Sequence, residues 1–332
     1  MSESIDQDPL DLFESSLPPL FEQPIIAHSS SFSNIYVHEH PLLPFPIKLG
    51  FPNPPARLNN LQAQYLWPSG IYLSHLILTG VVDLGREGQG KGRVLELGAG
   101  MGLPGIMALV SMALDLEQTE EKVELESGTS CLGKTPTIPT KDDMVESQEE
   151  LGTVVATDFG DSGICDILRE NYLLVLDTLT SYIRSQSQPQ SQSRAKVKQN
   201  PGWEVLGYEW GTDPASLLVA PSGQIPRKYS TLLLSDTLFH TSSHLSLLQS
   251  IYSLLEPIHG KAYITAGFHG GSRGTVDRFL ELARTGGCLV RELNVVKWDP
   301  RTESWADVEN KVEGEYGEGV VWSGLLTLND KS

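Results

Sequence analysis

Residues 92–109 read Gly92-Arg93-Val94-Leu95-Glu96-Leu97-Gly98-Ala99-Gly100-Met101-Gly102-Leu103-Pro104-Gly105-Ile106-Met107-Ala108-Leu109. The apolar run 94–97 is typical of a buried strand, and the apolar segment 106–113 indicates a helix. The glycines between them let the backbone turn sharply and approach a ligand closely. Pro104 suits the first turn of a helix, where a missing N–H costs nothing. A strand, a glycine turn and a helix N-terminus together predict a nucleotide-binding element.

Two cofactors fit these glycines. Gly100-x-Gly102-x-x-Gly105 satisfies the dinucleotide pattern, which has little specificity by itself. Glu96 discriminates between them, because a carboxylate at the end of the strand suits a cationic amino-acid head group and disfavours a pyrophosphate. Glu96-x-Gly98-x-Gly100 resembles motif I of the class I S-adenosylmethionine (SAM) methyltransferases, in which the acid and the glycine turn hold the methionine part of SAM. We therefore favour SAM over NAD.

Composition narrows the range of partners. The chain has 332 residues, of which 39% are hydrophobic, and a formal net charge of −18. Such a charge argues against nucleic acid or an anionic membrane as the main partner, because phosphate groups need a basic surface. Residues 115–150 contribute eleven acidic residues against three lysines. A basic protein or a small molecule is compatible with the remainder.

The cysteines and histidines predict neither disulfides nor a metal site. Cys131, Cys165 and Cys288 are odd in number and show no CxxC spacing, which fits a reducing compartment. His240 and His244 have the spacing of a metal pair on a helix, but no acidic third ligand accompanies them. The sequence also lacks a signal peptide and any run of about 20 apolar residues, so we expect a cytoplasmic protein without a membrane span.

Residues 1–60 are rich in proline, serine and acidic residues, and we interpret them as a partly disordered N-terminal arm. Within this arm, 34–38 and 46–50 are expected to pair as a small hairpin. Two alternatives stay open, a loosely packed arm and an arm that folds over the active site.

Residues 61–330 are predicted to form one domain with disordered insertions near 116–150 and 184–200. Between 61 and 78 the pattern is helical but broken at Trp67-Pro68, so a helix should restart near Ser69. Further strands and helices alternate along the chain, with strands at 152–158, 203–210, 230–235, 261–266, 288–296 and 319–328 and helices at 161–183, 244–255 and 275–284. This order predicts an α/β fold, a doubly wound Rossmann-like seven-stranded mixed sheet with helices on both faces.

Ligands of such sheets bind beyond the carboxyl ends of the strands. The second strand ends in Asp158, which lies about 20 residues past the glycines once the 116–150 insertion is removed. That is the usual place of an acid that binds ribose hydroxyls, and Phe159 beside it is placed to touch the adenine. Trp210 is expected near the adenine edge, and Asp236 at the end of the fourth strand.

Several of these segments resemble one known family. Together, Trp67-Pro-x-Gly, the segment 95–99, Thr157-Asp158, Trp210-Gly211 and Leu-Leu-Leu-Ser235-Asp236-Thr-Leu-Phe239-His240-x-x-x-His244 resemble the lysine methyltransferase-like branch of the seven-β-strand enzymes. The nearest likeness is to a fungal group that holds nicotinamide N-methyltransferase-like proteins and an elongation factor one-alpha N-terminal and lysine methyltransferase. The glycine-rich segment 268–273 and the long loops depart from that pattern and leave the substrate open.

The resemblance implies a SAM-dependent N-methyltransferase that modifies a lysine or an N-terminal amine of a cytosolic protein, with elongation factor one-alpha as one candidate. The chain should be a monomer. The implied cofactor site consists of Trp67, Glu96, Gly98, Ala99, Gly100, Asp158, Phe159, Trp210 and Ser235. Asp236 to Phe239 would line the acceptor channel.

The chemistry gives Asp236 and Phe239 candidate catalytic roles. A lysine, with an ordinary pKa of about 10.4, must lose a proton before it can accept a methyl group. Asp236 would orient the ammonium while Phe239 holds the cation against its ring. The alternative is that Asp236 merely caps the following turn. The signature of enzymes that methylate nucleic-acid amines, Asn or Asp followed by Pro-Pro and an aromatic residue, does not occur in this segment.

Three other functions were weighed. A nicotinamide-type enzyme would methylate a small molecule, and a SAM-fold binding module would recruit a partner without turnover. An NAD-dependent oxidoreductase has the least support, since no Lys-Tyr or His-Asp catalytic pair is evident in the sequence.

Overall fold

The computed structural model describes residues 35–51, 65–85, 92–114, 152–160, 163–186, 201–218, 227–268, 273–299, 304–308, 316 and 319–329. The predicted insertion at 116–150, most of the one at 184–200, and residues 1–34 of the predicted arm lie outside these ranges.

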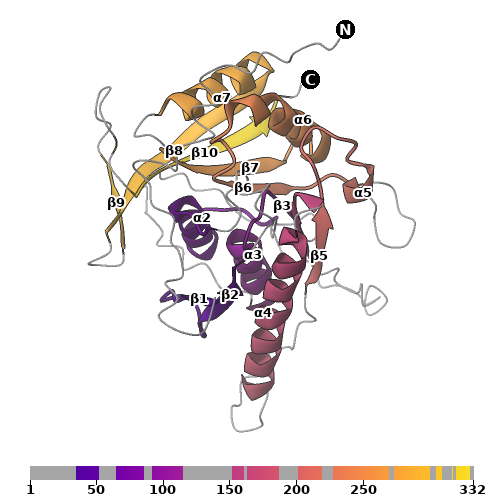
Figure 1. Ribbon diagram of the computed structural model, residues 1–332, viewed down its shortest axis with the longest axis vertical. Helices are drawn as coiled ribbons and strands as arrows, with labels where there is room; N and C mark the ends of the chain where they lie inside the picture. The colour runs from indigo at the N-terminus through magenta and orange to yellow at the C-terminus, as the bar shows by residue number, and fades with distance from the viewer. Residues whose placement is uncertain are drawn as a thin grey trace, which may run out of the picture.

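One eight-stranded sheet forms the centre of the molecule (Figure 1), in the order β5-β4-β3-β6-β7-β10-β8-β9. Five neighbouring strands are parallel, and β10 runs antiparallel between β7 and β8. The strands are β3 (Arg93–Leu97), β4 (Thr153–Asp158), β5 (Gly202–Gly207), β6 (Thr231–Ser235), β7 (Lys261–Gly267), β8 (Cys288–Asp299), β9 (Ser304–Asp307) and β10 (Val320–Leu328). The doubly wound α/β prediction is confirmed.

The structure adds one strand that was not predicted. β9 pairs antiparallel with the end of β8, where Trp298 faces Trp305 with ring centroids 5.0 Å apart. β8 therefore continues three residues beyond the predicted end of its strand. β9 has only four residues and alternates little in polarity, so its sequence shows no strand periodicity from which it could be predicted.

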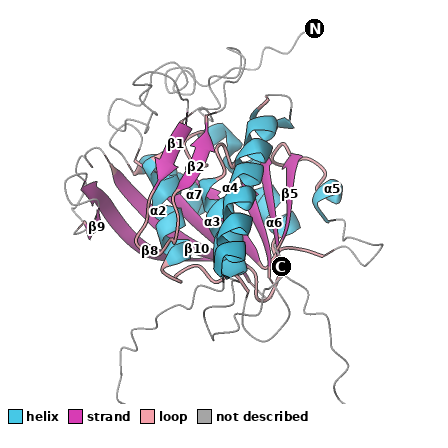
Figure 2. Ribbon diagram, turned by 90° about the horizontal axis from the view of Figure 1, so that it is seen from below, coloured by secondary structure: helices cyan, strands magenta, loops and turns pink. Residues whose placement is uncertain are grey.

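Helices cover both faces of the sheet. Figure 2 shows α2 (Pro68–Leu78), α3 (Leu103–Leu114) and α4 (Ile164–Gln186) on one face, while α6 (His244–Leu254) and α7 (Gly274–Thr285) pack on the other. Short turns complete the fold at α5 (Ala215–Leu218) and η4 (Thr241–Ser243). α3 is buried over its first nine residues, which explains why its sequence is apolar on all sides. In the described part of the chain, no helix is long and apolar enough to span a membrane.

The predicted hairpin forms and packs on the domain. β1 (Ile35–His38) pairs antiparallel with β2 (Ile47–Gly50), and Ile47 and Leu49 are fully buried. Asn171 of α4 fixes its end, because the side chain accepts the Gly50 N–H at 2.6 Å and donates to the Gly50 carbonyl at 3.1 Å. The same amide donates to the carbonyl of Met101 at 3.1 Å. This part of the predicted arm is therefore joined to the glycine turn through α4.

Candidate active site

A pocket of about 320 Å³ lies at the carboxyl ends of the parallel strands. Its walls come from the turn after β3, the ends of β4 and β6, the loop after β5, the approach to α2, and the start of α6. It contains ten of the eleven predicted site residues, namely Trp67, Gly98, Ala99, Gly100, Asp158, Phe159, Trp210, Ser235, Asp236 and Phe239. Glu96 is the exception.

The glycine turn at residues 98–102 forms a cradle in which a side chain on Gly98 would clash with Trp210. Gly98 has a φ of 69°, in the left-handed region, and a Cβ placed on it would lie 2.9 Å from Cζ2 of Trp210. Trp210 itself is held by α6, because Ser250 accepts the N–H of Gly211 at 2.8 Å. The indole and the turn are thus fixed close together, with room for a flat group beside them.

Asp158 organises the turn from the end of β4. One carboxylate oxygen accepts the N–H of Gly100 at 2.7 Å, and the other accepts the N–H of Phe159 at 2.7 Å. Burial raises the pKa of this carboxyl, while the two N–H donors oppose that rise. Each oxygen keeps a second lone pair, so Asp158 can also accept a hydrogen bond from a ligand hydroxyl.

Glu96 does not face the pocket, which corrects the direct contact expected from the sequence. It is fully buried, and its Oε2 accepts the N–H of Gly105 in the first turn of α3 at 3.0 Å. Its Oε1 has no hydrogen-bond partner among the described residues, as is also true of the nearby Tyr172 hydroxyl. Burial, with a smaller contribution from Asp158, raises the pKa of Glu96 to about 8. The Glu96 side chain turns beneath the glycine loop and is removed from water. With its pKa raised to about 8, the carboxyl is mainly protonated, and therefore uncharged, at neutral pH.

This placement gives Glu96 a different way to discriminate between cofactors. A dinucleotide pyrophosphate needs free N–H groups at the N-terminus of α3. Gly105 gives its N–H to Glu96, Pro104 has none, and Ile106 donates to the carbonyl of Gly102 at 2.9 Å. The protein's own carboxyl thus takes one of the N–H groups that a diphosphate would need.

Asp236 follows β6 in a strained conformation. Its φ of 53° is left-handed, which is uncommon for residues other than glycine and recurs at functional sites. Its N–H donates to the carbonyl of Thr265 at 2.8 Å, and its Oδ1 accepts the N–H of Gly267 at 3.1 Å. The end of β7 therefore holds the carboxylate on the pocket wall, 7% exposed.

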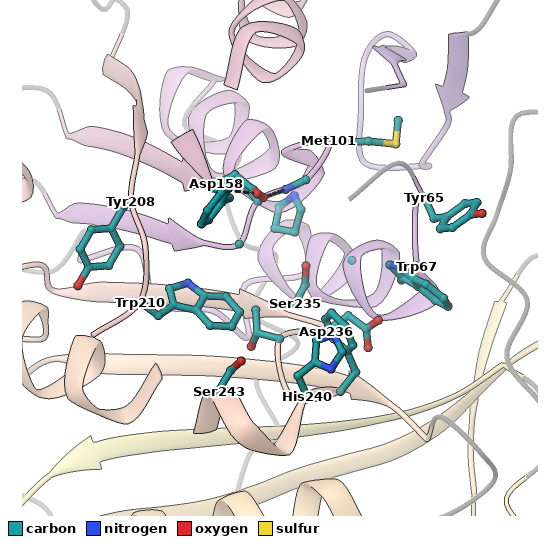
Figure 3. A pocket seen from close by; sticks show the side chains of 18 of the residues that line it. Tyr65, Trp67, Met101, Asp158, Tyr208, Trp210, Ser235, Asp236, His240 and Ser243 are labelled. Atoms are coloured by element: carbon teal, nitrogen blue, oxygen red, sulfur yellow. Dashed lines mark hydrogen bonds between the residues drawn. The ribbon is translucent and has the colours of Figure 1, made fainter. Parts of the chain in front are cut away.

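Aromatic side chains stand on two sides of the pocket. Figure 3 shows Tyr65 and Trp67 on one side, and Tyr208 and Trp210 on the other. Tyr65 and Trp67 meet edge to face with ring centroids 5.9 Å apart. Trp67 adopts the extended backbone that Pro68 imposes, and α2 starts immediately after it, as the sequence predicted to within one residue. Such walls suit flat or cationic ligands.

Sequence reasoning missed a part of the lining. Tyr65, Tyr208, Glu209, His240, Ser242, Ser243 and Ser246 also face the pocket. β5 ends at Gly207, three residues before the predicted end of that strand, so Tyr208 and Glu209 lie in the loop before Trp210. Their position directly before Trp210 was a usable signal. Ser242 and Ser243 come from η4 and Ser246 from the start of α6, and only the folded chain brings these elements to the pocket.

The two histidines spaced four apart separate in the fold. His240 lines the pocket, whereas His244 is buried in the core, where Nε2 lies 2.9 Å from the carbonyl oxygen of Leu238 and the ring packs edge to face on Phe279. Within the described ranges no group of three His, Cys, Asp or Glu side chains could hold a metal ion. Cys165 and Cys288 are buried and unpaired with another cysteine.

The charged groups of the pocket have one sign. The described lining includes the carboxyl groups of Asp158, Glu209 and Asp236 and no lysine or arginine. Such a lining favours a cationic ligand and disfavours an anionic one.

Known proteins share this sequence pattern. Residues 57–130 match the model of a family described as lysine methyltransferase. One relative is the protein N-terminal and lysine N-methyltransferase EFM7 of Candida glabrata, 29% identical over 116 residues that cover 34% of this chain and 44% of the relative. EFM7 of Candida albicans is 28% identical over 128 residues, covering 36% and 48%. The chain thus matches slightly less than half of the length of these relatives.

A solved structure of a human methyltransferase 10 domain containing protein is 9% identical and covers 79% of this chain and 83% of its own, with a TM-score of 0.37. The sequence matches confirm the predicted resemblance to lysine methyltransferases.

Proposed function

We propose that this chain is a SAM-dependent N-methyltransferase that modifies a lysine or an N-terminal amine of a protein. The observation that carries the proposal is the lining of the pocket, which has three carboxyl groups and no lysine or arginine among the described residues. SAM bears a sulfonium and an ammonium, and the acceptor amine binds as an ammonium. An acidic, aromatic pocket suits both cations, whereas a dinucleotide carries a diphosphate.

The cofactor's nucleoside fits the side of the pocket formed by the glycine turn. Asp158 would accept hydrogen bonds from ribose hydroxyls, and Phe159 and Trp210 would flank the adenine. Gly98 lets the turn lie against Trp210, because a Cβ there would clash with the indole ring. When bound, SAM supplies a methyl group activated by its positive sulfur.

The acceptor fits the side formed by Trp67, Asp236 and Phe239. The Asp236 carboxylate, held by the end of β7, would orient an incoming ammonium, and the aromatic rings would bind the cation while they exclude water. Positioning of the nitrogen supplies much of the acceleration in such a displacement.

A protein acceptor is supported by the names of the two relatives, which are protein N-terminal and lysine N-methyltransferases. The net charge of −18 adds to this support, since it favours a basic partner. We propose a cytosolic acceptor, with elongation factor one-alpha as the first candidate, and a monomeric enzyme.

Calorimetry and labelling test the proposal together. We expect the protein to bind SAM and not NAD, and to transfer label from methyl-labelled SAM to purified elongation factor one-alpha or to one discrete band of a cytosolic extract. Asp236→Asn should retain SAM binding and lose transfer, while Glu281→Gln on the exposed face of α7 should behave as wild type. Label found only in small metabolites would favour the nicotinamide-type enzyme. SAM binding without any methyl transfer would favour a binding module. Absence of SAM binding would refute the proposal.

A further inference from the structure

His240 lines the pocket beside the predicted catalytic residue Phe239. It follows Phe239 in the loop after β6, and the two rings lie 4.3 Å apart between centroids. It also occupies the N-cap position of η4, but its side chain makes no capping hydrogen bond there, since the main-chain carbonyl alone accepts the N–H of Ser243 at 3.1 Å. The imidazole lines the pocket and does not cap η4.

The reaction proposed above needs a proton acceptor in this part of the pocket. An amine bound as an ammonium has no lone pair, so one N–H bond must break before a bond to carbon can form. In general an aspartate is a weaker base than a histidine, because their ordinary pKa values are about 3.9 and about 6.5. Each pKa unit is a factor of ten, so a histidine favours the proton transfer about 400-fold more than an aspartate does.

We propose that His240 is the general base that takes a proton from the acceptor ammonium, a role that rests on the proposed methyltransferase function. The ammonium N–H bond breaks, its electron pair stays on nitrogen as the nucleophile, and the proton passes to a ring nitrogen of His240. The imidazolium returns this proton to solvent after the turnover. Asp236 keeps its place as the residue that orients the ammonium.

The charges around His240 are compatible with this cycle. In the pocket the ionisable side chains are those of Tyr65, Asp158, Tyr208, Glu209 and Asp236. Figure 3 shows Asp236 and His240 on the same side of the pocket as Trp67. These carboxylates give the imidazolium opposite charges within the same pocket.

One further titratable group interacts with His240 from the protein side. His244 of α6 is a neighbouring base whose pKa is lowered chiefly by burial, with smaller contributions from Arg278 of α7 and from His240. His244 therefore stays neutral and buried, and it does not compete for the proton.

His240→Gln and His259→Gln provide a matched pair for the test. His259 is an exposed histidine in the loop that leads to the start of β7, at the opposite edge of the sheet. With labelled SAM and elongation factor one-alpha as acceptor, we expect His240→Gln to lower kcat about 100-fold at pH 7.5. KM and the affinity for SAM should stay near wild type. The deficit should shrink as the pH approaches 10, where the amine loses its proton without help.

A second measurement needs no acceptor. Sinefungin is a SAM analogue with an amine where SAM has the methyl-bearing sulfur, and S-adenosylhomocysteine has no group there. In NMR spectra of histidine-labelled protein, the imidazole signals of His240 should differ between the complexes with sinefungin and with S-adenosylhomocysteine, and those of His259 should be the same in both. The signal of His240 is identified by its loss in His240→Gln.

Two results would overturn the role of His240. One is a variant whose rate stays below wild type by the same factor from pH 7 to pH 10, as a structural defect would produce. The other is a set of His240 imidazole signals that is identical with sinefungin and with S-adenosylhomocysteine. A wild-type protein that binds SAM but transfers no methyl group would instead contradict the proposed function itself, and then the NMR comparison would still test the proximity of His240 to the amine.

Discussion

Replacement of Glu96 by glutamine should make the protein less sensitive to alkaline pH. In the fold, burial raises the pKa of this carboxyl from 4.5 to about 8. The folded protein therefore holds a proton that the unfolded chain releases near pH 4.5, and stability falls as the pH rises toward 8. The interval of 3.5 pKa units corresponds to about 5 kcal/mol over the full range, and about 3 kcal/mol of it falls between pH 6 and pH 8.5.

Glutamine copies the shape of the protonated acid. Its carbonyl oxygen can accept the N–H of Gly105 as Oε2 of Glu96 does at 3.0 Å, and it does not ionise. We expect the free energy of unfolding of the variant, relative to that of wild type, to rise by about 3 kcal/mol between pH 6 and pH 8.5. Urea unfolding followed by tryptophan fluorescence at both pH values measures this difference.

Glu281→Gln serves as the control, because Glu281 is exposed on α7 and its replacement should leave the pH dependence of wild type unchanged. Parallel losses of stability in wild type and Glu96→Gln would contradict the reasoning. So would a loss of more than about 3 kcal/mol at pH 6 in the variant, since that outcome would mean that the fold depends on an ionised Glu96.

Three further outcomes follow from the contacts. Gly98→Ala should lower SAM affinity at least tenfold in calorimetry, because φ is +69° and a Cβ would meet the ring of Trp210; unaltered affinity would exclude this cradle as the cofactor site. Asn171→Ala should cost about 2–3 kcal/mol in urea unfolding and speed amide exchange at Gly50, since the three hydrogen bonds of its amide are lost. Burial lowers the pKa of His40 to about 4, so stability should fall as the pH drops from 6.5 to 4, and a His40→Gln variant with the same acid sensitivity would refute this.

The fold class could be read from the chain because its signals are local. The apolar run before Gly98, the proline at the start of α3 and the alternation of strands with helices all lie within short segments. Trp67-Pro68 likewise marked the start of α2, because proline restricts its predecessor to an extended backbone. β9 was not predicted, because four residues without strong alternation of polar and apolar side chains show no strand periodicity.

Most of the pocket was also predictable, for a topological reason. Residues that end parallel strands meet at one edge, so Asp158, Trp210 and Asp236 were expected together and line one pocket. Residues that reach the pocket from other elements, such as Tyr65 before α2 and Ser246 on α6, carry no such positional signal.

The sequence by itself determined the residue types and their order, and hence a glycine turn, the strand ends and a set of acids and aromatics at one edge of a sheet. Only the tertiary structure decided where each side chain points. Glu96 shows the difference, since a strand places successive side chains on opposite faces, and the packing of α3 and α4 over β3 turned this carboxyl beneath the loop. The same packing removes it from water, and that desolvation, which no local pattern encodes, sets its charge.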